Sequence, residues 1–168
     1  NVGPEPTPFV SKEVFGDCKI HLQFQLPEKG NSGVYVMGRY EVQLLDSSGK
    51  EADLKMGDCG GIYAGNTWPG RAPDFNAFRE AGQWHDLDIE FQPPRFDAAG
   101  KKTENARFLR VRIDDVLLHE NVEVPEPTLG PLFGDESPTG PLMLQGDHGP
   151  VAYRELRVGA AGTLTLTG

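Results

Sequence analysis

Short stretches in which polar and apolar residues alternate constrain the fold of this chain more than any other feature of its sequence. In KIHLQFQL at 19–26, every second residue from Ile20 onward is apolar and each neighbour is polar. WHDLDIEF at 84–91 and RFLRVRI at 107–113 repeat this pattern. Because successive side chains of a β-strand point to opposite faces, a period of two predicts half-buried strands.

Turn-forming residues separate these stretches along the whole chain. With 21 Gly and 14 Pro among 168 residues, the composition fits a protein with many tight turns better than a helical bundle. A chain of this length fits one domain and can bury a substantial core. We therefore expect an all-β fold, an antiparallel sandwich of two sheets, formed by one domain over residues 1–168.

Two stretches predict in detail which side chains face the core. In 107–113, the alternation places Leu109 and the two apolar residues at alternate positions after it on the inner face. In VAYRELRV at 151–158, the apolar residues change parity halfway along. Such a change predicts a β-bulge near Arg154 or Glu155.

Charge and hydropathy limit the partners of the protein. The formal net charge is −9, and 16 Lys and Arg residues are scattered among 25 Asp and Glu residues. We therefore expect no nucleic-acid partner and no anionic membrane surface. The apolar runs are only a few residues long, far short of the roughly 20 that cross a bilayer, so we expect no membrane insertion.

The two cysteines, Cys18 and Cys59, are too far apart in sequence for a CxxC motif. Two alternatives remain open, a single disulfide or two small buried thiols. The acidic residues show no calcium-loop spacing, so we expect no cofactor and no metal site, although a structural calcium would be compatible with this class of fold.

Three connections, 46–61, 65–83 and 125–141, are longer than ordinary hairpin loops. Long ordered loops on a rigid scaffold are commonly functional. The second carries Trp68 and other aromatic residues, which would suit either stacking on a sugar ring or packing the loop onto the sandwich. Tyr63 lies between glycines in GGIYAG, which allows close backbone approach and favours a role facing ligand.

The stretch RYEVQLLD at 39–46 predicts a strand with a polar face and an apolar face. Its polar face would carry Arg39, Glu41 and Gln43, and its apolar face Tyr40, Val42 and Leu44. The alternation ends at Leu45 and Asp46, which predicts a bulge or the end of the strand. The polar row serves either as an ordinary ion-paired sheet face or as a binding surface.

Several longer motifs occur together in one order, namely GNSGVYVMGRYEVQLLDS, CGGIYAG, AGQWHDLDIEFQPPRFDAAGK and GPLMLQGDHGPVAYRELRV. From about Phe15 to Val158 the chain resembles the 3-keto-disaccharide hydrolase domain family. The resemblance implies a concanavalin A-like jelly-roll sandwich with a concave sheet facing carbohydrate. Because the family is frequent in secreted bacterial proteins, it also implies an extracellular, periplasmic or cell-surface location.

The family pattern usually includes one more strand or hairpin upstream of VSKEVFGD, where this chain has only NVGPEPTPF. We therefore expect a trimmed or divergent member, or one module of a longer protein with further domains. The tail GTLTLTG at 162–168 has strand character and is expected to cover an open sheet edge.

The resemblance also implies a reaction, cleavage of the glycosidic bond of a sugar already oxidised at C3. A ketone at C3 acidifies the C2 proton, so a base removes it, the C1 substituent leaves and water adds afterwards. Glu41 is the expected base and His148, in QGDHG, the expected proton donor. The predicted substrate-binding residues are Arg39, Gln43, Tyr63, Trp68 and Gln145.

A second mechanism, direct hydrolysis by two carboxylates, would pair Glu41 with Asp46. It requires carboxylates about 5 Å apart for retention or about 6.5–9.5 Å apart for inversion, and only a bulge or bend would bring these two close. Both residues also have purely structural interpretations. Asp46 would cap the DSSG turn, and His148 would be a turn residue in DHGP.

Two functions that need no catalysis stay open beside the enzyme. The first is a non-catalytic carbohydrate-binding module of a larger secreted protein, and the second is an interaction domain of a surface protein. An oligosaccharide or glycoside is the expected ligand of both the enzyme and the binding module.

Overall fold

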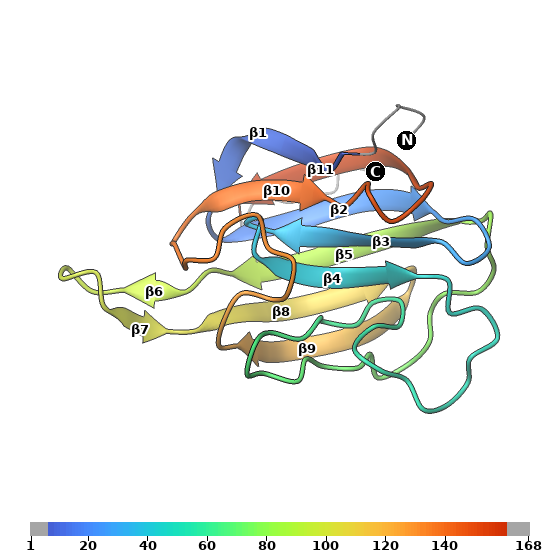
Figure 1. Cartoon of the computed structure of the whole chain (residues 1–168), viewed down its shortest axis with the longest axis horizontal. Coiled ribbons are helices and arrows are strands. Elements are labelled where there is room, and N and C mark those ends of the chain that lie inside the picture. Colours follow the sequence, from blue (N-terminus) through green and yellow to red (C-terminus); the bar gives the residue numbers. More distant parts are fainter. Residues whose placement is uncertain (1–6, 161–168) are drawn as a thin grey trace.

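Eleven strands and no helix make up the regular structure of residues 7–160, the part of the chain that the computed structural model describes (Figure 1). The expected tail strand at 162–168 lies outside these residues. None of the described segments forms a helix long and apolar enough to cross a membrane. The strands are β1 (Phe9–Phe15), β2 (Cys18–Gln25), β3 (Asn31–Val36), β4 (Tyr40–Leu45), β5 (Trp84–Gln92), β6 (Arg95–Phe96), β7 (Lys102–Glu104), β8 (Ala106–Ile113), β9 (Val116–Val124), β10 (Gly140–Leu144) and β11 (Ala152–Ala160).

The strands form two main sheets that lie one on the other (Figure 1). One sheet has four strands in the order β1-β10-β3-β4, and the other has five in the order β11-β2-β5-β8-β9. All pairings are antiparallel. The short β6–β7 hairpin projects from one end of the sandwich (Figure 1). The expected all-β jelly-roll sandwich is therefore confirmed.

The core lies between the two sheets and consists of the apolar sides of the alternating strands. On β2, Ile20, Leu22 and Phe24 are buried while their polar neighbours are partly exposed. On β4, Tyr40 and Val42 face the same core. Full burial of each such aliphatic or aromatic side chain contributes about 1.5–3 kcal/mol to the free energy of folding, so this layer is the main source of stability. Cys18 and Cys59 are buried in it as free thiols, which answers the question of the disulfide.

One predicted core position is wrong, because β8 contains a bulge. The pairing of β5 with β8 runs from Glu90 opposite Arg110 directly to Phe91 opposite Phe108, which leaves Leu109 without a partner. The extra residue reverses the parity of the strand, so Phe108 is buried and Leu109 is only half-buried. The bulge predicted in β11 is confirmed, since its register shifts between Arg154 and Arg157 and Glu155 has a φ of 55°.

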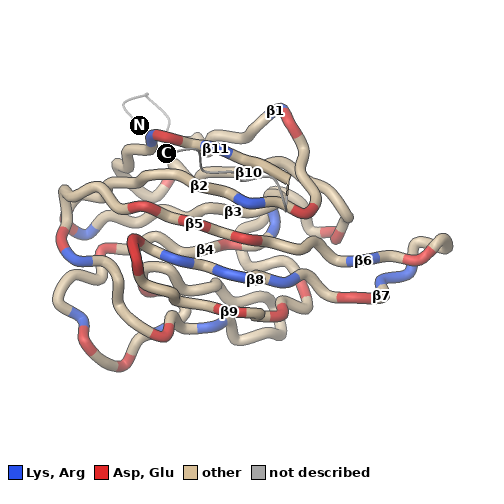
Figure 2. The backbone as a smooth tube through the Cα atoms, turned by 180° about the vertical axis from the view of Figure 1, so that it is seen from behind, with Lys and Arg blue, Asp and Glu red and all other residues tan. Residues whose placement is uncertain are grey.

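The outer face of the five-stranded sheet carries charges of both signs (Figure 2). Acidic residues of β5 lie between the basic residues of β8 and the polar residues of β2. Glu90, for example, lies within 3.2 Å of Lys19 and 3.5 Å of Arg110. The charges on this face are therefore mixed in sign, and several of them pair with one another.

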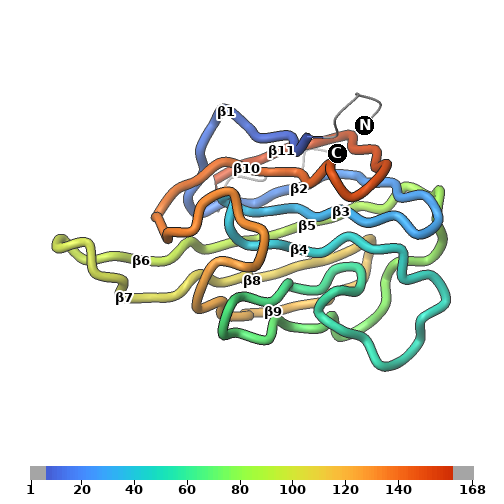
Figure 3. The backbone as a smooth tube through the Cα atoms, in the orientation of Figure 1, coloured from blue at the N-terminus to red at the C-terminus, as the bar shows by residue number. Residues whose placement is uncertain are grey.

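The opposite, four-stranded sheet is covered by loops rather than open to solvent. The segment around residues 60–65 runs beside β4, and the loop between β9 and β10 crosses the end of the β3–β4 hairpin (Figure 3). As a result all of β4 from Tyr40 to Leu44 is buried, on both faces of the strand. The polar face of β4 is therefore enclosed by loops and is not an ordinary sheet face open to solvent.

Candidate functional site

A tight hairpin between β3 and β4 sets the register of the site. Three residues, Met37, Gly38 and Arg39, connect the paired residues Val36 and Tyr40, and the first two have positive φ angles of 58° and 62°. This turn places Tyr35 opposite Glu41 and Gly33 opposite Gln43. The polar residues of both strands therefore share one face of the sheet.

The free edge of β4 is paired by the glycine-rich segment that carries Tyr63. The Gln43 amide donates to the Gly61 carbonyl (2.8 Å), and the Gly60 amide donates to the Gln43 carbonyl (2.7 Å). The Tyr63 amide donates in turn to the Glu41 carbonyl (3.1 Å). These bonds hold the Tyr63 backbone against β4 and bring its ring beside Glu41.

Thr128 fastens the β9–β10 loop over the same face. This buried residue donates from its backbone amide and its hydroxyl to the Arg39 carbonyl (2.9 and 3.0 Å), and its hydroxyl oxygen accepts from the Glu41 amide (3.0 Å). The next amide, of Leu129, donates to the Ala64 carbonyl (2.7 Å). The loop is thereby tied to β4 and to the Tyr63 segment at once.

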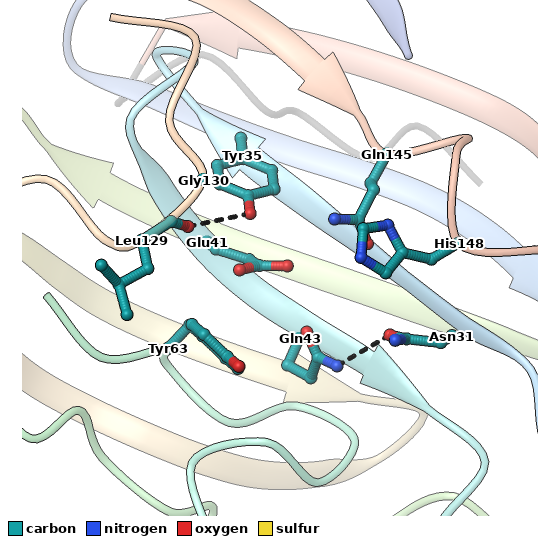
Figure 4. A pocket seen from close by; sticks show the side chains of 9 residues that line it. All are labelled: Asn31, Tyr35, Glu41, Gln43, Tyr63, Leu129, Gly130, Gln145 and His148. Atoms are coloured by element: carbon teal, nitrogen blue, oxygen red, sulfur yellow. Dashed lines mark hydrogen bonds between the residues drawn. The ribbon is translucent and has the colours of Figure 1, made fainter. Parts of the chain in front are cut away.

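These elements enclose a pocket of about 240 Å³ on the four-stranded sheet (Figure 4). Its residues come from β3, β4, the Tyr63 segment and the loops on either side of β10. They are Asn31, Tyr35, Glu41, Gln43, Tyr63, Leu129, Gly130, Gln145 and His148. Of these described lining residues, Glu41 is the only carboxylate.

Glu41 is a buried acid at the centre of the pocket and is only 2% exposed. Burial raises its pKa from the ordinary 4.5 to about 7, with a hydrogen bond from Tyr35 acting in the opposite direction and the charge of Asp147 adding to the rise. The carboxylate lies directly over Gly33, where a side chain would collide with it. A pKa near neutrality allows a carboxylate to act as a proton acceptor and then to release the proton.

Tyr35 connects Glu41 to the loop above the sheet. Its hydroxyl donates to the Leu129 carbonyl at 3.1 Å and is also within hydrogen-bonding reach of the Glu41 carboxylate. Burial and the negative charge of Glu41 raise the pKa of Tyr35, so the phenol keeps its proton. Because a phenol has one proton, Tyr35 donates to one of these two acceptors at a time.

Amide and imidazole side chains form the other side of the pocket. Gln43 donates from its Nε2 to the Asn31 Oδ1 at 2.9 Å. The backbone N–H of Gln145 donates to the Gly33 carbonyl at 2.8 Å, which extends the sheet beyond the end of β10 and places the Gln145 side chain at the pocket. His148 is half-exposed, and its Nδ1 lies 2.8 Å from the Asp147 Oδ1. This side therefore offers several donors and acceptors at fixed positions.

Five of the predicted site residues come together in this pocket, namely Glu41, Gln43, Tyr63, Gln145 and His148. The other three, Arg39, Asp46 and Trp68, do not line it.

Arg39 has the same parity as Glu41, but it lies at the turn between β3 and β4 and its side chain is held away from the pocket. It is 4% exposed and donates to the backbone and side chain of Asp135 (2.5 and 2.8 Å). Its guanidinium lies 4.7 Å from the centre of the Phe133 ring. These contacts make it an anchor of the β9–β10 loop.

Asp46 follows the end of β4 and caps the turn. It accepts from the Lys29 amide (2.7 Å) and from the amide and hydroxyl of Ser48 (3.1 and 2.5 Å). The bond from the Ser48 hydroxyl is the largest cause of a lowered pKa at Asp46, so the group stays ionised. The structure thus gives Asp46 its turn-capping role, and no bulge brings it to Glu41.

Trp68 packs against the hydrophobic core, and its amide donates to a Glu126 carboxylate oxygen at 2.8 Å. Phe78 of the same connection is buried. Of the two readings of this aromatic loop, packing onto the sandwich is the one that the structure shows for these residues.

Four lining residues were not identified from the sequence, namely Asn31, Tyr35, Leu129 and Gly130. Asn31 and Tyr35 have the same parity on β3, so the hairpin register would have located them beside Gln43 and Glu41. Leu129 and Gly130 lie in a loop whose path no local pattern predicts. Within residues 7–160, no group of three or more His, Cys, Asp or Glu residues is arranged to hold a metal ion.

The fold and the pocket define a jelly-roll domain of the carbohydrate-active class. The chain belongs to the 3-keto-alpha-glucoside-1,2-lyase-like domain family, whose model matches residues 1–159. This match confirms the resemblance noted in the sequence. No curated protein matches the chain.

Solved structures show the same architecture. A candidate glycosyl hydrolase from Parabacteroides distasonis is 25% identical, with a TM-score of 0.74 over 91% of this chain and 67% of the other. A second candidate glycosyl hydrolase from that organism is 16% identical, with a TM-score of 0.64 over 94% and 76% of the two chains. The carbohydrate-binding module CBM66 from Bacillus subtilis is 10% identical, with a TM-score of 0.56 over 94% and 84%.

Proposed function

We propose that this pocket cleaves the glycosidic bond of glycosides oxidised at C3, by elimination followed by hydration. The observation that carries the proposal is a single buried carboxylate, Glu41, with a pKa of about 7, in a pocket otherwise lined by amide, phenol, imidazole and apolar groups. The name of the family, a lyase-like domain acting on 3-keto-alpha-glucosides, supports the same chemistry.

In the first step, the Glu41 carboxylate accepts the C2 proton, and the electron pair of the C2–H bond passes into an enolate whose charge rests on the C3 oxygen. The enolate then re-forms the ketone as the C1=C2 double bond forms and the C1–O bond breaks. The leaving oxygen takes a proton and departs as an alcohol. Water finally adds across C1=C2, which returns hydrogen to C2 and gives the free 3-keto sugar.

The surrounding residues fit the remaining roles. Donors from Gln43, Asn31 and Gln145 would hold the sugar hydroxyls and the enolate oxygen, whose charge is better stabilised in an enclosed site than in water. His148, oriented by Asp147, would relay protons between the pocket and solvent, and the leaving oxygen would take its proton from water. Hydrolysis by two carboxylates is less well supported, because the lining residues provide only Glu41 and the structure assigns Asp46 to a turn.

Isotopes at C2 provide the test. Elimination predicts that a substrate with deuterium at C2 reacts more slowly, and that the 3-keto sugar formed in heavy water carries deuterium at C2. Glu41→Gln is expected to abolish turnover and retain binding, whereas the matched change Glu90→Gln, on the outer face of the other sheet, leaves both unchanged. Cleavage without an isotope effect or C2 exchange would show direct displacement and refute the proposal.

A non-catalytic carbohydrate-binding module is the second candidate function. The several amide side chains at fixed positions in the pocket suit the binding of sugar hydroxyls as well as catalysis. Binding of 3-keto and ordinary glycosides by the wild-type protein, with cleavage of neither, would establish this alternative.

A further inference from the structure

We propose that the two sides of the pocket bind different parts of the substrate, the polar side taking the oxidised sugar and the apolar side taking an apolar leaving group. The substrate class would then be aryl or alkyl 3-keto-glycosides rather than 3-keto-disaccharides. This inference rests on the proposed function and adds the identity of the leaving group.

The division of the pocket is visible in the positions of its side chains. Gln43, Asn31, Gln145 and His148 lie on one side of Glu41, and Leu129 lies on the other (Figure 4). A C2 atom placed at Glu41 with the remaining sugar hydroxyls toward the amides would direct the neighbouring C1 substituent to the Leu129 side. The base would then lie at the boundary between the two subsites.

Leu129 provides the apolar side chain of this side, and Gly130 and the rings of Tyr35 and Tyr63 also line the pocket. Leu129 is 43% exposed, although its backbone is fixed by the bond from its amide to the Ala64 carbonyl. A fixed backbone that holds an exposed apolar side chain at a pocket wall provides apolar area for a ligand to cover.

Two polar groups near Leu129 are already engaged or point elsewhere. The Leu129 carbonyl accepts the Tyr35 hydroxyl, and the hydroxyl of Tyr63 points toward Gln43 (Figure 4). A second sugar placed against Leu129 would bury hydroxyl groups without partners, which carries a desolvation cost. A phenyl or alkyl group has no such cost and gains from the contact.

The experiment compares Leu129→Ser with Leu132→Ser, a matched change in the same loop. Leu132 is 41% exposed, but it lies over Gly38 at the hairpin turn and does not line the pocket. For each protein, kcat/KM is measured with phenyl 3-keto-α-glucoside and with a 3-keto-disaccharide that has a glucosyl leaving group. Expressing each value relative to the wild type with the same substrate cancels the intrinsic reactivity of the two leaving groups.

Leu129→Ser is expected to lower kcat/KM for the phenyl glycoside on the order of tenfold and to change the disaccharide by less than about twofold. Leu132→Ser is expected to leave both within about twofold. Equal losses on the two substrates with Leu129→Ser, or no loss on either, would overturn the inference.

Binding separates this inference from the proposed function. In the Glu41→Gln background, the dissociation constants of the two glycosides are compared with and without Leu129→Ser. If the wild type cleaves neither compound, the proposed function fails, and a selective loss of phenyl glycoside binding still establishes the apolar subsite. If binding of the phenyl glycoside is unaffected by Leu129→Ser, the subsite is wrong even when the enzyme is active.

Discussion

Replacing Glu41 by glutamine should alter the pH dependence of folding stability in a way that reports the burial of this carboxyl directly. Glutamine has nearly the shape of a protonated glutamate and cannot ionise. The variant therefore keeps the packing over Gly33 and removes a single titration.

The size of the effect follows from the difference between the folded and unfolded pKa of Glu41. Burial raises the pKa from the ordinary 4.5 to about 7, so the folded state binds more protons than the unfolded state between these two pH values. Stability from the protonated carboxyl is fully present below pH 4.5 and is lost as the pH rises through about 7. Over this window, the ionisation of Glu41 lowers the free energy of unfolding by about 3 kcal/mol.

Urea unfolding of both proteins at several pH values from 4.5 to 8 provides the assay. The other titrating groups are the same in both chains, so they largely cancel in the difference between the two free energies. We expect Glu41→Gln to become more stable relative to wild type by about 3 kcal/mol across the series. A difference that stays constant with pH would show that Glu41 is not desolvated, and the reasoning about the base would fail with it.

Three further changes test the surroundings of Glu41. Gly33→Ala should displace the Glu41 carboxylate and reduce turnover, while near-native circular dichroism shows that the sandwich still forms. Tyr35→Phe removes a hydrogen bond that lowers the pKa of Glu41, so the acid limb of the kcat/KM profile should move to higher pH. The control Tyr153→Phe removes a hydroxyl that bonds to Ser32, on the opposite face of β3, and should leave that limb in place. Asp46→Ala should cost about 1 kcal/mol in urea unfolding through the lost turn bonds and leave kcat unchanged, and a large loss of kcat would return Asp46 to the catalytic site.

The strands that alternate without interruption could be predicted from the sequence. The predicted segments 19–26 and 84–91 correspond to β2 and β5, which are adjacent in the sheet and pair residue by residue from Cys18 opposite Phe91 to Gln25 opposite Trp84. In such strands every second side chain faces the core, so the alternation in the sequence predicts directly which residues are buried.

Where the pairing contains an extra residue, the alternation misleads or disappears. At Leu109, the apolar residue takes the unpaired position and the core position passes to Phe108. In β9, Leu118 and His119 are adjacent and both buried, because the register shifts at that point, and no alternation marked the strand. Bulges are fixed by the partner strand, which a local pattern does not contain.

From the sequence alone, only the site residues that belong to a single strand could be placed relative to one another. Parity placed Glu41 and Gln43 on a common face, and the structure keeps them together in the pocket. Parity placed Arg39 on that face too. In the structure, Asp135, nearly a hundred positions further along the chain, holds the Arg39 side chain away from the pocket. Leu129 was not predicted for the same reason, since its position depends on the bond from Thr128 to Arg39 and on its own bond to Ala64, which join distant segments.

The loops that the sequence leaves undefined are also what gives Glu41 its chemistry. On an open sheet face, a glutamate between an arginine and a glutamine would remain hydrated and keep a pKa near 4.5. Here the Tyr63 segment and the β9–β10 loop cover β4. The first bonds to the backbone carbonyl of Glu41, and the second bonds through Thr128 to its backbone amide. The coverage removes water from the carboxylate while the strand fixes its position, and the raised pKa follows from the two together. A strand motif alone would therefore identify the acid and misjudge its strength, and the same motif in a chain with shorter loops should yield a binding surface instead of a base.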